Sequence, residues 1–225
     1  MEITQIAVIR TDFPEKFGIP RQSGLADNLR ARIVFEPEFR NPEALRGLDG
    51  FSHLWLIWEF SANSGTKVWY PTVRPPRLGG NRQMGVFATR SPYRPNPLGL
   101  SCVEIESIIT DSPEGPVINV KGADLMDGTP IYDIKPYIGY SDSRPDAVCG
   151  YASGSPERVL SVAISEDTAA KMKEASKIPA LVEILELDPR PSYHNDPERV
   201  YGLSFAGQNI RFVVRDKVLT VIDIE

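Results

Sequence analysis

The chain contains little of the chemistry that metal sites and hydrolytic triads require. Its 225 residues include two histidines, His53 and His194, and two cysteines, Cys102 and Cys149, which form no CxxC pair. So few nitrogen and sulfur ligands argue against a zinc site, and we expect no bound metal. They also leave little material for a Ser-His-Asp triad, and the chain has no GxSxG motif. Two isolated thiols indicate a reducing compartment and no disulfide framework.

Long apolar runs and glycine-rich cofactor motifs are also missing. No apolar run approaches the roughly 20 residues that span a bilayer. The first ten residues contain an acid and lack the apolar region of a signal peptide. We therefore expect a cytoplasmic protein without a membrane partner. No GxGxxG follows a strand and opens a helix, and there is no Walker motif, which disfavours the common dinucleotide and nucleoside triphosphate sites.

The composition that remains is that of an ordinary soluble globular protein. Hydrophobic residues make up 41% of the chain and charged residues 24%. The length allows one large or two small domains with a sizeable core. The net charge of −5 argues against a general electrostatic coating of nucleic acid, but it leaves room for a local basic face.

A local basic segment runs from Arg74 to Ser101 and contains no acidic residue and no lysine. Its arginines are Arg74, Arg77, Arg82, Arg90 and Arg94. Frequent prolines and glycines predict a shaped loop, with a strand only over Met84 to Thr89. Arginine forks on stiff loops bind carboxylates and phosphates, whereas surface arginines on a solvated loop bind nothing in particular. The absence of nearby carboxylates favours the anion site.

The first 140 residues combine about seven short strands with one clear helix. We predict strands over residues 3–10, 32–36, 51–60, 84–89, 102–109, 117–121 and 131–137. Asn41 can cap a short helix that begins at Pro42 and ends at Gly47. Residues 51–60 are apolar at both odd and even positions, which predicts a strand buried on both faces, although a helix fits the same periodicity. We interpret His53 as a hydrogen-bonded core histidine rather than as a base. This pattern predicts an antiparallel barrel or sandwich.

A polar segment over residues 141–155 predicts a domain boundary. We divide the chain into residues 1–140, a linker over 141–157 and a small α+β domain over 158–225, so that the whole is mainly β. The last part is predicted to contain a strand over 158–165, a helix over 166–177 capped by Ser165, and a second helix that begins at Pro179. Strands over 201–205, 210–215 and 218–224 complete it as a meander.

Two further stretches carry candidate chemistry. Asp133 and Lys135 lie two residues apart on a predicted strand and therefore share a face. Such a pair is usually solvated and worth under ~1 kcal/mol, but beside a pocket it can orient a polar substrate group. Asp127-Gly128 forms a turn. Arg190 is fixed between two prolines, where it either staples its loop or presents an exposed guanidinium to a phosphate or base.

Five motifs together resemble the TrmO family, also called the TsaA-like or YaeB family. They are PRQSG, TVRPPRLGGN, MGVFATRSPYRPNPLGLS, DGTPIYDIKPY and DPRP, and the similarity covers nearly the whole chain. The resemblance implies an N-terminal β-barrel that binds S-adenosylmethionine, a small C-terminal domain and a homodimer. The activity that it implies is methylation of N6 of threonylcarbamoyladenosine, next to the anticodon of tRNA.

The resemblance also implies a cofactor site. Its residues in this chain would be Pro20, Arg21, Gln22, Ser61, Ala62, Arg90, Leu100, Asp124, Leu125, Met126, Asp127 and Gly128. Arg21 or Arg90 can pair with the cofactor carboxylate, and Asp124 or Asp127 can accept from its ammonium or ribose. Where other members have a His-Gln pair this chain has Ser61-Ala62, so that backbone contacts can persist but side-chain hydrogen bonds cannot.

The acceptor nitrogen needs a partner for its proton, because a carbonyl and a purine delocalise its lone pair. Asp127, Asp133 or a tyrosine can fill that role, with Lys135 beside them. We expect Lys135 and Arg190 to face the anticodon arm, with Arg94 and Arg77 adding to the basic surface.

Two alternatives to this function stay open, together with the assembly state. One is a methyltransferase of the same build with another substrate, and the other is a non-catalytic module that senses S-adenosylmethionine or binds RNA. The retained acceptor-side residues favour an enzyme over a sensor. The aromatic run 51–58 either lies in the barrel core or partly covers a two-fold dimer interface, and the resemblance favours the dimer.

Overall fold

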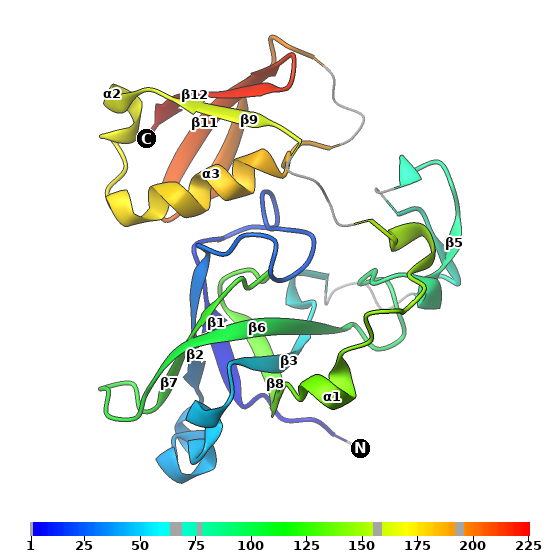
Figure 1. The fold of residues 1–225 in the computed structure, drawn as a ribbon, viewed down its shortest axis with the longest axis vertical. Helices are drawn as coiled ribbons and strands as arrows, with labels where there is room; N and C mark the ends of the chain where they lie inside the picture. The colour runs from blue at the N-terminus through cyan, green and yellow to red at the C-terminus, as the bar shows by residue number, and fades with distance from the viewer. Residues whose placement is uncertain (1, 64–68, 76–77, 155–158, 192–195) are drawn as a thin grey trace.

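Two large sheets, each with its own hydrophobic core, dominate the described part of the chain, and a two-stranded ribbon adds a third small sheet (Figure 1). The computed structural model describes residues 2–63, 69–75, 78–154, 159–191 and 196–225. The first sheet is a closed six-stranded antiparallel barrel, and the second is a four-stranded sheet packed against a helix. The predicted mainly β class is therefore confirmed, with a barrel rather than a sandwich in the N-terminal half.

The barrel closes because its first and last strands pair with each other. The strands are β1 (Ala7–Arg10), β2 (Arg30–Phe35), β3 (His53–Glu59), β6 (Leu98–Ile109), β7 (Val117–Lys121) and β8 (Thr129–Pro136). Their order is β1-β2-β7-β6-β3-β8, with β8 antiparallel to β1. Branched side chains such as Ile9, Ile33, Leu54 and Ile118 fill the interior without solvent exposure. Closure leaves the barrel without a free strand edge.

Strand β3 alternates between its two faces, so the prediction that it is buried on both was wrong. Leu54, Leu56 and Trp58 point into the core, whereas the odd-numbered residues face outward. The outward Trp55 is partly covered, because its indole N–H donates to Asp142 of α1 (Gly139–Asp142) at 2.9 Å. His53 is exposed rather than a core histidine, and its Nδ1 hydrogen-bonds the neighbouring Ser52 hydroxyl at 2.9 Å.

The sequence predicted the capping residues of the N-terminal half correctly, but it predicted the lengths of a helix and a strand less well. Asn41 caps as predicted, but the helix is a single 3₁₀ turn (Pro42–Leu45), and Gly47 takes the left-handed conformation at φ +83°. The strand predicted over 84–89 is reduced to β5 (Met84–Gly85), which pairs with β4 (Thr72–Val73). A 3₁₀ turn over Val86–Ala88 follows, because Thr89 bonds back to the Val86 carbonyl through both N–H and hydroxyl.

The second sheet has the order β10-β11-β12-β9, with β9 parallel to β12. Its elements are β9 (Ser161–Ile164), α2 (Glu166–Ala169), α3 (Ile178–Glu186), β10 (Tyr201–Phe205), β11 (Gln208–Arg215) and β12 (Val218–Ile224). Helix α3 lies across one face of this sheet (Figure 1). Across the parts of the chain that the structure describes, none of the helices has the length and apolarity of a membrane span.

The predicted helix 166–177 was wrong in length. Ser165 caps its start as predicted, but α2 ends after one turn and the chain re-enters a 3₁₀ turn at Ala175–Lys177. The buried Gln208 side chain explains the break. Its amide oxygen accepts from the Lys173 N–H at 2.8 Å and its amide nitrogen donates to the Lys171 carbonyl at 3.0 Å, so these backbone groups are satisfied outside a helix.

The segment between β1 and β2 joins the two units. Phe13 of this segment lies in the core of the C-terminal unit, with its ring centroid 5.4 Å from that of Phe205. Asp12 pairs with Lys177 at 2.6 Å. The Glu183 carboxylate accepts from the backbone and side-chain amides of Asn28 at 2.9 and 2.8 Å. Residues 11–29 thus leave the barrel, pack on the second unit and return to the barrel.

Candidate functional site

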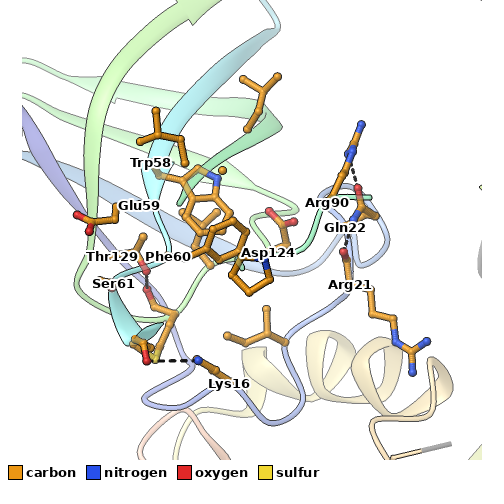
Figure 2. A pocket seen from close by; sticks show the side chains of 18 of the residues that line it. Lys16, Arg21, Gln22, Trp58, Glu59, Phe60, Ser61, Arg90, Asp124 and Thr129 are labelled. Carbon is orange, nitrogen blue, oxygen red and sulfur yellow. Dashed lines mark hydrogen bonds between the residues drawn. The ribbon is translucent and has the colours of Figure 1, made fainter. Parts of the chain in front are cut away.

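A cavity of about 520 Å³ lies at the barrel end where β3 finishes and where β6 and β8 begin. Its volume falls within the range of roughly 300–1,000 Å³ that is typical of small-molecule sites. Four segments that are distant in sequence form its walls, namely 16–22, 58–62, 89–100 and 124–129. Figure 2 shows Trp58 and Phe60 in the middle, with Arg90, Gln22 and Arg21 on one side and Glu59 on the other.

Ten of the twelve cofactor-site residues that the resemblance implies meet at this cavity. They are Pro20, Arg21, Gln22, Ser61, Ala62, Arg90, Leu100, Asp124, Leu125 and Met126. Asp127 and Gly128 are not among its lining residues. The Asp127 carboxylate instead accepts from the Thr11 N–H at 3.0 Å and pairs with Arg10 at 3.4 Å, which ties its turn to the end of β1.

Asp124 is the buried carboxylate of the cavity. Ser101, itself buried, donates its hydroxyl to Asp124 at 2.6 Å and accepts from the Trp58 indole N–H at 3.0 Å. Burial raises the pKa of Asp124, and the Ser101 hydrogen bond and the charge of Arg90 act in the opposite direction. A carboxylate held in this way is well placed to accept from a cationic or hydroxyl-bearing ligand.

The positions of the Trp58 and Phe60 rings in the cavity wall depend on a glycine at position 99, which has no side chain. A Cβ atom there would lie 2.3 Å from Cε2 of Trp58, closer than atoms can approach. The indole occupies that space and meets the Phe60 ring edge-on, with 4.4 Å between centroids. Glycine in the RPNPLGLS motif therefore serves close packing of β6 against Trp58.

The cationic side of the cavity is built from the loop residues. The Arg90 guanidinium donates to the side-chain oxygen of Gln22, whose amide donates to the Arg21 carbonyl. Arg94 also lines the cavity, but it is used locally, since it donates to the carbonyls of Thr89 and Ser91 at 3.1 and 3.3 Å. Arg90 is thus presented to the cavity on a loop that Arg94 stiffens.

The Ser61-Ala62 pair lines the cavity, and the backbone of Ala62 holds a neighbouring wall. The ammonium of Lys16 donates to the Ala62 carbonyl at 3.4 Å, which links the wall 16–22 to the wall 58–62. Lys16 was not among the residues predicted from the sequence, because a lone lysine outside the motifs carries no such signal.

Glu59 is a second cavity residue that sequence reasoning missed. It accepts a 2.5 Å hydrogen bond from the Tyr132 hydroxyl, which raises the pKa of Tyr132 to about 12. The only hint in the sequence was the position of this acidic residue at the end of the most apolar strand. Trp58, Phe60 and Thr129 also line the cavity without having been predicted.

Asp133 and Lys135 lie together but outside the cavity lining. Their side chains form an ion pair at 2.8 Å and are each about half exposed, as expected for a pair on one face of a strand. Among the described residues, no three His, Cys, Asp or Glu side chains gather in a way that could hold a metal ion.

Arg190 staples its own loop, so the expectation of an exposed guanidinium was wrong. Its side chain is 13% exposed, and its guanidinium donates to both carboxylate oxygens of Asp188 at 2.8 and 2.9 Å. These hydrogen bonds raise the pKa of Arg190. Asp188 has a left-handed backbone (φ 52°), and its fork with Arg190 holds that turn. Arg77 lies outside the described residues.

The chain matches two domain profiles along its length. The profile of the tRNA-methyltransferase O N-terminal domain matches residues 8–143, and that of the TrmO C-terminal domain matches residues 157–225. A tRNA (adenine(37)-N6)-methyltransferase of Escherichia coli (strain K12) is 38% identical over 231 residues, covering 100% of this chain and 97% of that protein.

Proteins of Pseudomonas aeruginosa are similar in sequence and in structure. A protein of strain PAO1 named putative S-adenosylmethionine-dependent methyltransferase RcsF is 39% identical over 230 residues, covering 99% of this chain and 96% of that protein. A crystal structure of TrmO from P. aeruginosa superposes with a TM-score of 0.78 at 33% identity, covering 100% of this chain and 96% of that one. The likeness extends over both units.

Proposed function

The chain belongs to the tRNA-methyltransferase O family, and on that premise we propose that it is an S-adenosylmethionine-dependent methyltransferase acting on N6 of the adenine at position 37 of tRNA. The observation that carries this proposal is the convergence of four distant segments on one cavity, three of which contain residues of the family motifs. That cavity combines a guanidinium, a buried carboxylate and aromatic walls.

The residues of the cavity fit the groups of S-adenosylmethionine. Arg90 can pair with the carboxylate of the cofactor, and Asp124 can accept from its ammonium or ribose. Trp58, Phe60 and Leu100 offer apolar surface to the adenine. When bound, the cofactor supplies an electrophilic methyl group. The contribution of the chain is alignment, which can lower the barrier by about 7–11 kcal/mol.

The acceptor side calls for a group that engages the proton on N6. Asp127 and Asp133, each paired with a cation, remain our proposed candidates, with Lys135 beside Asp133. The position of Glu59 in the cavity wall adds it to them, together with its hydrogen-bonded partner Tyr132. We propose further that the substrate base carries a threonylcarbamoyl group.

Methyl transfer to tRNA tests the activity directly. Total tRNA from cells able and unable to make threonylcarbamoyladenosine would be incubated with the protein and cofactor carrying a labelled methyl group. We expect label at position 37 only in the first tRNA. Equal labelling of both would remove the threonylcarbamoyl requirement, and labelling of neither, with cofactor binding retained, would identify a sensor or binding module.

Calorimetry of cofactor binding tests the site. Arg90→Ala should weaken binding by about 1.5–3 kcal/mol, because a charge-assisted hydrogen bond is lost. Arg82→Ala is the matched control, since Arg82 is exposed on the same segment and does not line the cavity. Equal affinities of the two variants would exclude Arg90 from the site.

We also propose a two-fold homodimer that works in the cytoplasm, in keeping with the family resemblance. Trp58 is buried in the barrel, so the Phe and Trp surface that residues 51–58 offer to a partner is limited to Phe51 and the partly covered Trp55. Light scattering at micromolar concentration would refute the dimer if it gave the mass of one chain.

A further inference from the structure

Two exposed aromatic rings stack on each other beside the cavity. The rings of Trp69 and Phe87 have centroids 6.3 Å apart and planes 26° from parallel. Their exposed fractions are 46% and 72%, large values for apolar rings that already have a partner. Exposed apolar side chains that gather into a patch mark binding sites, whereas a single exposed one needs no explanation.

A small ribbon holds the two rings together. Strand β4 pairs with β5, and the Val86 N–H donates to the Pro71 carbonyl at 2.9 Å just beyond the ribbon. Val86 is buried, which anchors the following Phe87. Figure 1 shows the β5 segment at the periphery of the molecule, and we call this segment with its ribbon the projection.

The segment that carries Phe87 is basic. The chain from Arg74 to Ser101 contains no acidic residue, and Arg74, Arg82 and Arg90 are exposed. This segment belongs to a chain of net charge −5, so a polyanion that approaches the protein is attracted locally to this side.

The projection is continuous with the cavity wall. Phe87 precedes Thr89 and Arg90, both of which line the cavity, by two and three residues. Two residues of chain span at most about 7 Å. Hydrogen bonds from Thr89 to the Val86 carbonyl and from Arg94 to the Thr89 carbonyl fix this connection. A polymer whose one base enters the cavity therefore has its neighbouring nucleotides near the rings.

We propose that Trp69 and Phe87 form a stacking platform for an unpaired base of the RNA substrate, next to the adenine that enters the cavity. This rests on the proposed function. A base that is taken out of its stack for chemistry leaves its neighbours unstacked, and exposed aromatic rings among arginines are the surface on which proteins restack single-stranded bases. A second copy of the chain is the rival occupant, and the experiment below separates the two.

Binding of an unmodified anticodon stem-loop RNA measures the platform. Phe87→Ala should weaken binding by about 5- to 150-fold, the range found when a stacking aromatic is removed. Phe87→Tyr should restore it, because a phenol ring stacks equally well. Tyr140→Ala is the control, since Tyr140 is 91% exposed and lies on another segment.

Further readouts distinguish stacking from charge and from structural damage. Phe87→Ala should leave cofactor affinity and the salt dependence of RNA binding unchanged and should raise KM for tRNA more than it lowers kcat. Arg82→Ala should instead flatten the salt dependence by about one unit of slope.

Three outcomes would overturn the platform. RNA affinity of Phe87→Ala equal to that of Tyr140→Ala, with methyl transfer by the unaltered protein intact, would refute it and leave the proposed function standing. A lower assembled mass of Phe87→Ala by light scattering, with unchanged RNA affinity, would assign the rings to a second copy. Failure of the unaltered protein to methylate tRNA would remove the proposed function on which the platform depends.

Discussion

Replacing Glu183 by alanine is expected to loosen one wall of the cavity from a distance. Glu183 lies on α3, is 8% exposed, and accepts two hydrogen bonds from Asn28. Asn28 belongs to the segment 11–29, which also carries Pro20, Arg21 and Gln22 of the cavity wall. That segment contains no helix or strand of its own, so contacts with the C-terminal unit hold its position.

The magnitude follows from the two bonds. A hydrogen bond to a charged acceptor contributes about 1.5–3 kcal/mol. Asn28 is exposed, so its donors find water once the carboxylate is removed, and the lower value applies to each bond. The total loss is therefore about 3 kcal/mol of unfolding free energy, or roughly 6–12 °C in melting temperature for a chain of this size. Glu183→Gln keeps one acceptor oxygen and should lose about half as much.

Urea unfolding and cofactor calorimetry measure both consequences. Cofactor affinity should fall along with stability, because a loosened segment must be ordered again when the ligand binds. Glu174→Ala is the control, since Glu174 is exposed on the same unit and its side chain makes no capping hydrogen bond. If Glu183→Ala matched this control in both stability and affinity, the link between the C-terminal unit and the cavity would be refuted.

Three other perturbations test the cavity. Gly99→Ala should destabilise the fold by about 1–3 kcal/mol, because its Cβ would lie 2.3 Å from the Trp58 indole; an unchanged urea midpoint would contradict this packing. Asp124→Asn should be more stable than the parent protein, because ionisation of the buried Asp124 carboxyl destabilises the folded state. The stability difference should grow as the pH rises from the ordinary pKa of 3.8 through the raised pKa of the folded protein, and a pH-independent difference in melting temperature would disprove it. Glu59→Gln should bring the pKa of Tyr132 down from about 12, and an ultraviolet titration that still ends near 12 would exclude their hydrogen bond as the cause.

Patterns carried by neighbouring residues predicted the fold well. Three strands were predicted at their observed bounds, Val117–Lys121, Tyr201–Phe205 and Val218–Ile224, where branched or aromatic residues predominate between clear turns. The caps at Asn41 and Ser165 were also predicted, because a cap is a contact within three residues.

Features set by distant residues could not be predicted in this way. The helix expected after Ser165 ends early because Gln208, about 40 residues later, takes over its backbone hydrogen bonds. The close approach of Gly99 to Trp58 likewise joins two strands.

The candidate site was accessible to prediction where motifs were long. Motif resemblance identified Arg90 and Asp124, which the structure brings to one cavity. It did not identify Lys16 or Glu59, single charged residues whose place depends on how the 16–22 segment and the end of β3 meet. Their positions follow from tertiary packing and not from local sequence.

The burial of Phe13 against Phe205 has a consequence for how the chain folds during synthesis. The two residues that touch are separated by most of the chain, and β11 and β12 of the same core are made later still. At about 5–20 residues per second, a ribosome needs about 10–40 s after making Phe13 to reach Phe205. Throughout that interval the aromatic ring lacks its partner. The segment 11–29 is therefore among the last parts to reach its final place, and β10 to β12 must be made before the cavity is complete.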